Sequence, residues 1–211
     1  MNKVLRSLFC GAALTGALTC ASLAADFTPC ADTLHSLGLF EGTGSGYALD
    51  RAPTRAEAAV MLVRLLGQED AARKLTYTAP FTDLEGWEAP YVQYLYDNKL
   101  TTGATATTFE PKAKCSAQMY TTFLLRSLGY SDAQNGDFAY TGALDFAADH
   151  VGLIDESFCD TNNFLRDNVA AMSLEALATP VKATDITLLD KLIADGAIDQ
   201  IKAAPLSQFI D

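Results

Sequence analysis

The sequence is poor in the side chains from which metal centres and most active sites are built. Its two histidines, His35 and His150, stand far apart and lack the spacing of metal ligands. No Gly-rich phosphate loop, nucleophile elbow or H-E-x-x-H motif occurs in the chain. We therefore expect no catalytic residues, no bound metal and no cofactor.

Cysteine is also scarce, with five in the chain, of which Cys30, Cys115 and Cys159 lie beyond residue 24. An odd number of thiols cannot pair completely, and this spacing matches no zinc motif. We expect all three to be buried and unpaired; one disulfide beside one free thiol is the alternative. A disulfide framework is thereby excluded as the main source of stability.

Positive charge is the third shortage. The chain has 15 Lys and Arg against 26 Asp and Glu, which gives a formal net charge of −11 at pH 7. Residues 1–24 hold two of the basic residues and none of the acidic ones, so the remainder carries −13. Such an acidic surface argues against nucleic acid as a partner.

Long apolar runs are missing except at the N-terminus. There Lys3 and Arg6 precede the uncharged run SLFCGAALTGALTCASLA, which ends in small residues. This pattern predicts a secretory signal peptide at residues 1–24, cleaved after Ser22–Ala24. The run is short for the ~20 residues of a membrane span, although a membrane anchor is the alternative. We expect an exported, soluble mature chain with no membrane insertion after signal removal.

The chain does contain an internal repeat. The segment TRAEAAVMLVRLLG (54–67) aligns without a gap with SAQMYTTFLLRSLG (116–129), and LRDNVAAMSLEALA (165–178) is a third copy. A second set of similar segments lies upstream, at 30–42, 91–103 and 143–155. An aromatic residue precedes each copy by seven positions: Tyr47, Phe109 and Phe158.

These periodic segments predict an all-α fold of three helix–loop–helix units at residues 26–72, 78–131 and 136–180. Residues 181–211 are expected to form an accessory helix, capped by Thr184 or Asp185, and a tail. Ile186, Leu189 and Ile193 are predicted to line the apolar face of that helix, and Asp195-Gly196 to end it.

One residue of the first repeated helix is electrostatically out of place. Thr54 and Glu57 have the spacing of a capping box, and Gly67 is a C-terminal stop signal. Arg55 stands in the first turn, where the helix dipole disfavours a cation. Because a helix N-terminus with unpaired N–H groups binds anions, Arg55 is a candidate anion ligand. The alternative is an internal ion pair with Asp50 or Glu57.

Taken together, the motifs resemble the S-layer homology family. FTDLEGW, with Phe81, Asp83 and Trp87, and TRAE, residues 54–57, are similar to the family's F-x-D, Trp and T-R-A-E elements. The resemblance implies a three-lobed helical prism with pseudo-threefold symmetry. It also implies non-covalent anchoring to an acidic secondary cell-wall polysaccharide, typically bearing a pyruvate ketal, at the cell surface or cell wall.

By the same resemblance, grooves between the units bind the sugar. The residues carried over as carbohydrate ligands are Thr54, Arg55, Glu57, Asp83, Trp87, Ser116 and Arg166. Ala117 replaces the arginine in the second unit, which weakens the groove there. Leu165 and Asn168 replace Thr and Glu in the third, so the capping box is expected to be lost, with Asn162 or Asn163 as substitutes. Trp87 either stacks on a sugar or packs in the core.

A second function fits the same repeats. A secreted helical scaffold or S-layer subunit would act through protein–protein contacts, with peptidoglycan or other surface proteins as partners. Binding to cell-wall sacculi that depends on the polysaccharide and on Arg55 would distinguish anchoring from this alternative.

Overall fold

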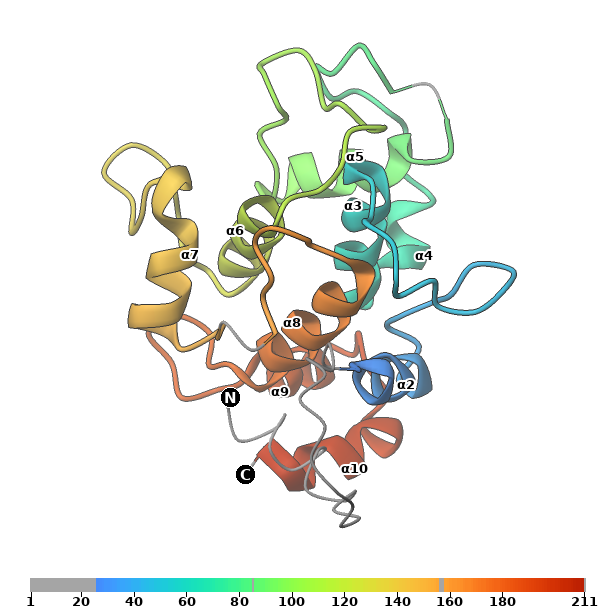
Figure 1. The fold of residues 1–211 in the computed structure, drawn as a ribbon, viewed down its shortest axis with the longest axis vertical. Helices are drawn as coiled ribbons and strands as arrows, with labels where there is room; N and C mark the ends of the chain where they lie inside the picture. Colours follow the sequence, from blue (N-terminus) through green and yellow to red (C-terminus); the bar gives the residue numbers. More distant parts are fainter. Residues whose placement is uncertain (1–25, 85, 156–157, 211) are drawn as a thin grey trace, which may run out of the picture.

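The computed structural model describes residues 26–84, 86–155 and 158–210, and the predicted signal peptide lies outside them. Within these ranges the chain is helical and forms three isolated β-bridges but no strand. The helices are α2 (Thr28–Ser36), α3 (Arg55–Leu65), α4 (Glu69–Ala72), α5 (Ala89–Asp97), α6 (Ala117–Ser127), η1 (Tyr140–Gly142), α7 (Ala143–Phe146), η2 (Ala147–Val151), α8 (Arg166–Ala178), α9 (Leu188–Ala194) and α10 (Gln200–Ile210). Figure 1 shows their arrangement.

The starts of α3 and α6 follow local sequence. The Thr54 hydroxyl accepts a hydrogen bond from the Glu57 N–H at 3.2 Å, and the Glu57 carboxylate accepts one from the Thr54 N–H at 2.8 Å. The predicted capping box is therefore confirmed. Ser116 caps α6 by accepting from the Met119 N–H at 3.2 Å. After α3 the backbone turns at Gly67 with a φ of 65°, as its C-terminal position requires.

The expected loss of the capping box at α8 is only half right. Leu165 has no side-chain acceptor, but the Leu165 N–H donates to Asn168 Oδ1 at 2.8 Å. One of the two hydrogen bonds of the box is thus retained, because the amide oxygen of Asn168 accepts from the N-cap N–H as a glutamate carboxylate does in a full capping box. The predicted substitutes, Asn162 and Asn163, do not cap the helix; their own N–H groups donate to Asp160.

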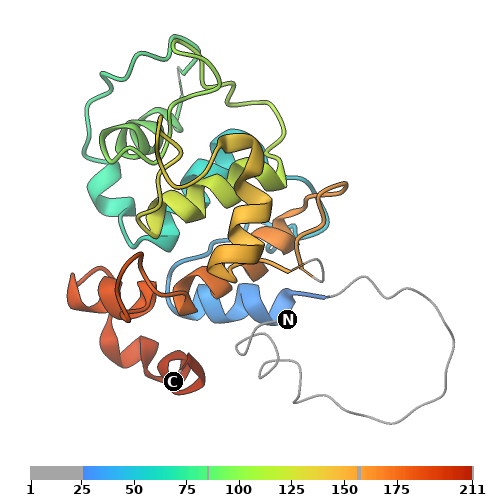
Figure 2. The same ribbon diagram turned by 90° about the vertical axis from the view of Figure 1, so that its left-hand side faces the viewer.

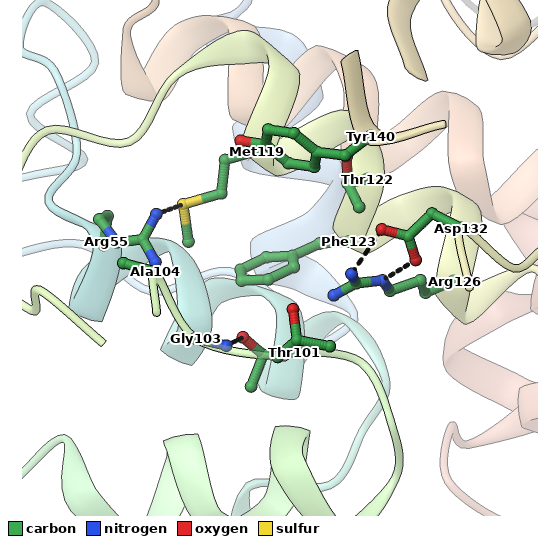
Figure 3. A pocket seen from close by; sticks show the side chains of 11 residues that line it. Arg55, Thr101, Gly103, Ala104, Met119, Thr122, Phe123, Arg126, Asp132 and Tyr140 are labelled. Atoms are coloured by element: carbon green, nitrogen blue, oxygen red, sulfur yellow. Dashed lines mark hydrogen bonds and ion pairs between the residues drawn. The ribbon is translucent and has the colours of Figure 1, made fainter. Parts of the chain in front are cut away.

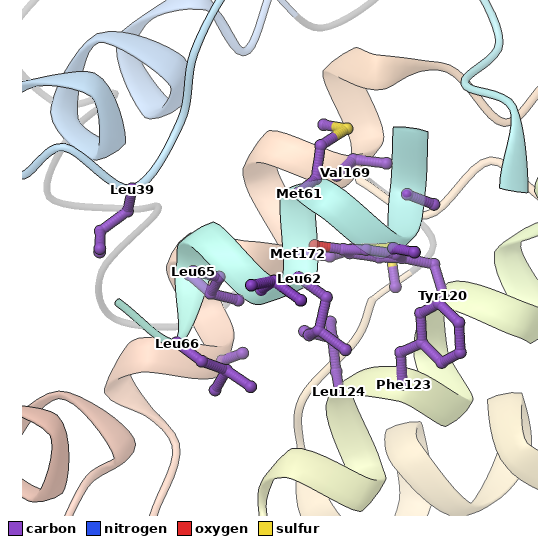
Figure 4. Close-up of a cluster of buried hydrophobic side chains, with 14 of the residues drawn as sticks. Leu39, Met61, Leu62, Leu65, Leu66, Tyr120, Phe123, Leu124, Val169 and Met172 are labelled. Atoms are coloured by element: carbon purple, nitrogen blue, oxygen red, sulfur yellow. The ribbon is translucent and has the colours of Figure 1, made fainter. Parts of the chain in front are cut away.

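The core forms where α3, α6 and α8 meet. These three helices contact one another pairwise, and an outer helix packs on each: α5 on α3, α7 on α6 and α2 on α8. The contact of α2 with α8 joins the beginning and the end of the repeated region. Leu62, Leu124 and Met172 are completely buried between these helices, as the close-up in Figure 4 shows.

The C-terminal segment contains two helices where the sequence predicts one. Thr187 caps α9 by accepting from the Asp190 N–H at 3.1 Å, so the predicted caps Thr184 and Asp185 are wrong. Ile186 is 54% exposed and does not line the buried face. The predicted break at Asp195-Gly196 is correct. Helix α9 contacts α8, and α10 contacts α9. Helix α10 lies at the end of the molecule opposite the α5–α6 loop (Figures 1 and 2).

The three cysteines of the described residues are buried and unpaired, as expected. Burial raises the pKa of the thiols of Cys30 and Cys115 to about 12 and that of Cys159 to about 11. These thiols therefore behave as small apolar side chains. Among the described residues, no helix has the length and apolar character needed to cross a membrane.

Candidate functional site

The N-terminus of α3 is seated on the loop that leads into α6. The N–H of Arg55 donates to the Ala113 carbonyl at 2.8 Å, and the N–H of Ala56 donates to the Pro111 carbonyl at 3.1 Å. These bonds satisfy two of the amides that a helix start leaves unpaired. The expectation of unpaired backbone N–H groups beside Arg55 is therefore wrong, because carbonyl groups of this loop accept hydrogen bonds from them.

The N-terminus of α8 is seated in the same way on the loop before α3. The N–H of Arg166 donates to the Arg51 carbonyl at 3.0 Å, and the N–H of Asp167 donates to the Leu49 carbonyl at 3.2 Å. These two acceptors precede Ala113 and Pro111 by 62 residues, the shift that relates segment 54–67 to segment 116–129. The two junctions are therefore equivalent in structure as well as in sequence.

The Arg55 side chain reaches across its junction. Its Nε donates to the Phe109 carbonyl at 2.7 Å, its Nη1 donates to Met119 Sδ at 3.0 Å, and its Cζ lies 5.1 Å from the centre of the Phe109 ring. Within the part of the chain that the structure describes, no carboxylate pairs with it, and Glu57 pairs with Arg51 instead. The alternative of an internal ion pair is thus not supported.

Arg55 lines a cleft of about 340 Å³ (Figure 3). Its walls come from three parts of the sequence: Arg55 at the start of α3, the α5–α6 loop and α6, and the segment from Asp132 to Tyr140. The lining residues are Arg55, Thr101, Thr102, Gly103, Ala104, Met119, Thr122, Phe123, Arg126, Asp132 and Tyr140. Figure 3 shows Arg55 on one side of the Phe123 ring and the Arg126–Asp132 pair on the other.

The second arginine of this cleft is already neutralised. Arg126 donates from Nε and Nη2 to the two oxygens of Asp132 at 2.8 and 2.7 Å, and from Nη1 to the Leu100 carbonyl at 2.9 Å. Burial acts to raise the pKa of Asp132, but the hydrogen bonds and charge of Arg126 hold it below its usual value. Arg55 is therefore the one lining cation of this cleft without a carboxylate partner among the described residues.

Arg166 lines an equivalent but smaller cleft of about 140 Å³. The lining residues are Glu41, Gly42, Thr43, Glu57, Val60, Met61, Arg64, Trp87, Tyr91 and Arg166. Arg166 is only 4% exposed, and it donates to the carbonyls of Tyr47 and Glu41 at 2.8 and 3.2 Å and to Met61 Sδ at 3.4 Å. Burial lowers the pKa of this guanidinium, and the nearby Arg51 charge lowers it further.

The loop and the helix that form one wall of each cleft correspond under the same 62-residue shift. Arg126 occupies the place of Arg64, whereas Gly103 and Met119 stand where Glu41 and Glu57 stand in the other cleft. At the third position of the repeat, Ala117 replaces the cleft arginine and Glu175 replaces Arg126. The cationic pattern is therefore absent from that third position.

The predicted site residues divide between different places. Thr54 and Ser116 cap helices and line neither cleft. Asp83 accepts from the N–H groups of Phe109 and Glu110 at 2.8 and 2.7 Å, so it holds the loop whose carbonyl binds Arg55. Glu57 lies in the Arg166 cleft.

Trp87 also lies in the Arg166 cleft and not beside Arg55. It is 61% exposed, so the alternative that it packs in the core is wrong. The exposed aromatic residue at the Arg55 cleft is Tyr140, which precedes α7 as Trp87 precedes α5 and is 45% exposed. Arg126, which also lines the Arg55 cleft, was not among the predicted site residues. The repeat alignment, which pairs Arg64 with Arg126, was a signal that could have identified it. No three His, Cys, Asp or Glu side chains of the described residues converge as metal ligands.

A cluster of hydrogen bonds around the Glu69 carboxylate lies next to the Arg166 cleft and supports its wall. Glu69 accepts from Arg64 at 2.9 Å, from Arg73 at 2.7 Å and from the Tyr91 hydroxyl at 2.8 Å, and thereby joins α3, α4 and α5. The Arg64 hydrogen bonds in particular hold the pKa of Glu69 at about 2. Because the folded pKa is depressed, this stabilisation is present above the ordinary pKa near 4.5 and is lost as pH falls toward 2.

We therefore expect Glu69→Gln to lower the free energy of unfolding by about 2–3 kcal/mol at pH 7. The difference from the parent protein should shrink between pH 4.5 and 2, where the parent carboxylate itself becomes protonated. Urea unfolding at several pH values measures this, with Asp70→Asn, an exposed neighbour, as the matched control. A constant difference across that pH range would contradict the assignment of the cluster.

Comparison with known proteins identifies part of the chain. Residues 80–116 match the model of the S-layer homology domain. The chain is 30% identical over 121 residues to the Middle cell wall protein of Brevibacillus brevis, and 30% identical over 106 residues to the Surface layer protein of Brevibacillus choshinensis. It is 28% identical over 109 residues to an endoglucanase of a Bacillus species.

These relatives are much longer proteins. The matched segments cover 56%, 49% and 46% of this chain but only 12%, 10% and 12% of the respective relatives. The similarity therefore concerns one module of each relative and not its whole activity.

Proposed function

We propose that this chain, whose residues 80–116 match the model of the S-layer homology domain, attaches non-covalently to the cell envelope. Its place is the cell surface or cell wall, in keeping with relatives named as cell-wall and surface-layer proteins. Its role is structural anchoring and not enzymatic turnover. The endoglucanase relative is consistent with this role, because only 12% of that protein is covered.

The proposed architecture is three S-layer homology repeats at residues 26–72, 78–131 and 136–180, arranged with pseudo-threefold symmetry. Three features support it: α3, α6 and α8 contact one another, each carries one outer helix, and two junctions share the same backbone hydrogen bonds. In this proposal α9 is the accessory helix of the segment 181–211, lying against α8. The repeats share one core because none buries enough apolar surface alone.

The proposed ligand is an acidic polysaccharide, with a carboxylate such as a pyruvate ketal bound by Arg55. The observation that carries this proposal is a guanidinium that lines an inter-repeat cleft and has no carboxylate partner among the described residues. Among the described residues its Nη2 has no acceptor and its Nη1 donates only to Met119 Sδ, so Nη2 and the second N–H of Nη1 can donate two parallel hydrogen bonds to a carboxylate. The cation costs α3 about 0.3–1 kcal/mol through the helix dipole, and a bound anion offsets this cost.

The acidic body of the protein does not prevent this contact. The formal net charge is −11, but exposed charges are screened beyond ~8 Å at physiological ionic strength. A direct guanidinium–carboxylate contact is shorter than that length, so repulsion slows association without removing the bound state.

Arg55→Ala should weaken binding to purified cell-wall sacculi by about 10- to 100-fold, because hydrogen bonds to a charged partner contribute roughly 1.5–3 kcal/mol. Co-sedimentation measures this, with sacculi used before and after acid extraction of the polysaccharide. Lys74→Ala is the control: it removes one charge from an exposed side chain that lines neither cleft. Binding that survives both Arg55→Ala and acid extraction would overturn the proposal in favour of a peptidoglycan or protein partner.

A further inference from the structure

We infer that Met119 is an oxidation site, at which a peroxide converts the thioether into a sulfoxide and thereby weakens anion binding by Arg55. The sulfoxide occupies guanidinium donors that a bound carboxylate needs. The regulatory part of this inference rests on the proposed function of Arg55, whereas the oxidation of Met119 depends only on the surroundings of its sulfur.

Met119 forms part of the cleft wall directly beside Arg55. Its Sδ accepts a hydrogen bond from Arg55 Nη1 at 3.0 Å, and Figure 3 shows the sulfur turned toward the guanidinium. The residue is only 4% exposed, but it lines the cleft of about 340 Å³. Because a water molecule takes up about 30 Å³, hydrogen peroxide, which is little larger, has room to enter this cleft and reach the sulfur.

The oxidation needs no reactant other than the thioether and the peroxide. A lone pair of Sδ attacks one oxygen of hydrogen peroxide, and the S–O bond forms as the O–O bond breaks. The proton of the transferred oxygen moves to the departing oxygen, so the products are the sulfoxide and water. The sulfur is oxidised and the peroxide is reduced by the same electron pair. Arg55 can donate a hydrogen bond to the departing oxygen while negative charge develops on it.

Oxidation changes what Arg55 can bind. A thioether sulfur is a weak acceptor, so in the reduced protein Met119 holds the guanidinium in place without neutralising it. The sulfoxide is polar, and its oxygen carries partial negative charge and accepts hydrogen bonds far more strongly. This oxygen competes with a carboxylate for the N–H groups of Nη1 and Nη2 and repels the incoming anion. The cleft therefore loses affinity for the anion when Met119 is oxidised.

Other sulfur atoms of the described residues differ from Met119 in their access to peroxide or in their reactivity. Met172 is completely buried and lines neither cleft, whereas Met61, which is 5% exposed, lines the Arg166 cleft. We therefore expect peroxide to oxidise Met119 and Met61 before Met172. The cysteines compete weakly, because burial raises the pKa of all three thiols and the thiolate is the reactive form.

At its position in the repeat, Met119 is the one side chain that peroxide can oxidise. Glu57 and Asn168 occupy the equivalent positions of the other two copies. The Glu57 carboxylate pairs with Arg51, and the Asn168 amide oxygen accepts a hydrogen bond at the start of α8. Sensitivity to peroxide at this position is therefore specific to the cleft that contains Arg55.

Peptide mass spectrometry after treatment of the full chain with hydrogen peroxide tests the oxidation site. The peptides that contain Met119 and Met61 should gain the mass of one oxygen atom before the peptide that contains Met172. Oxidation of Met172 as early as Met119 would overturn the assignment. This measurement requires no saccharide, so it judges the site even if the untreated chain does not bind sacculi through Arg55. That failure would refute the proposed function and the regulatory role with it.

Sacculus co-sedimentation before and after oxidation tests the regulatory role, with each variant compared with its own untreated sample. Oxidation should weaken binding of the parent about 5- to 10-fold, the effect of one net hydrogen bond, since the guanidinium keeps its charge. Met119→Leu should show no such loss. Met61→Leu, the matched control, should lose as much as the parent, because the Arg166 nitrogens near Met61 already donate to protein acceptors. Circular dichroism checks that the oxidised chains stay folded, and equal losses in the parent and in Met119→Leu would overturn the inference.

Discussion

Leu124→Ala should lower the free energy of unfolding by about 3–5 kcal/mol, the range seen when a fully buried leucine leaves a cavity. Leu124 lies on α6 where that helix meets α3 and α8, has no exposed surface, and is the counterpart of Leu62 in the repeat (Figure 4). Because helices from all three repeated segments surround this position, none of them can move to fill the space without disturbing another.

Urea unfolding monitored by circular dichroism measures this loss, which is a large part of the roughly 5–15 kcal/mol that stabilises a typical domain. Leu75→Ala is the matched control, since Leu75 is 36% exposed and should cost less than about 1 kcal/mol. Equal losses of unfolding free energy for the two variants would mean that the region where α3, α6 and α8 meet is not the core of this protein.

Gly103→Ala should lower the free energy of unfolding by about 3 kcal/mol or more and disturb the Arg55 cleft at the same time. Gly103 has a φ of 82°, where side chains are strained. A Cβ there would lie 2.6 and 2.7 Å from the carbonyl oxygens of Thr105 and Thr108, and 2.3 Å from Cε1 of Phe81. Backbone atoms form two of these contacts, so the loop itself must move.

Gly38→Ala separates backbone strain from this steric clash. Gly38 has a similar φ of 77°, but a Cβ would meet nothing within 4 Å. It should cost only about 1 kcal/mol, the strain of a left-handed conformation. Thermal unfolding compares the two variants, and sacculus co-sedimentation should show a defect for Gly103→Ala alone. If Gly38→Ala were as damaging as Gly103→Ala, close packing of the α5–α6 loop would not be the cause.

What local chemistry encodes could be predicted from the sequence. The box of Thr54 and Glu57, the turn at Gly67 and the break at Gly196 depend on residues within one or two turns of each other, so the sequence alone specifies them. The all-α class followed from periodicity for the same reason. The prediction of a single C-terminal helix was wrong. Several polar residues before α9 could cap a helix, so the sequence did not single out Thr187, and no local signal marked α10 as a separate helix.

The amino-acid sequence by itself determined that a cation would stand in the first turn of α3. Only the tertiary structure decided what that cation faces. The loop from Phe109 to Ala113 occupies the backbone amides that sequence reasoning left free, and Tyr140 rather than Trp87 enters the Arg55 cleft. Segments that meet in a junction are far apart in the chain, so their pairing depends on how the outer helices pack, which no local pattern encodes.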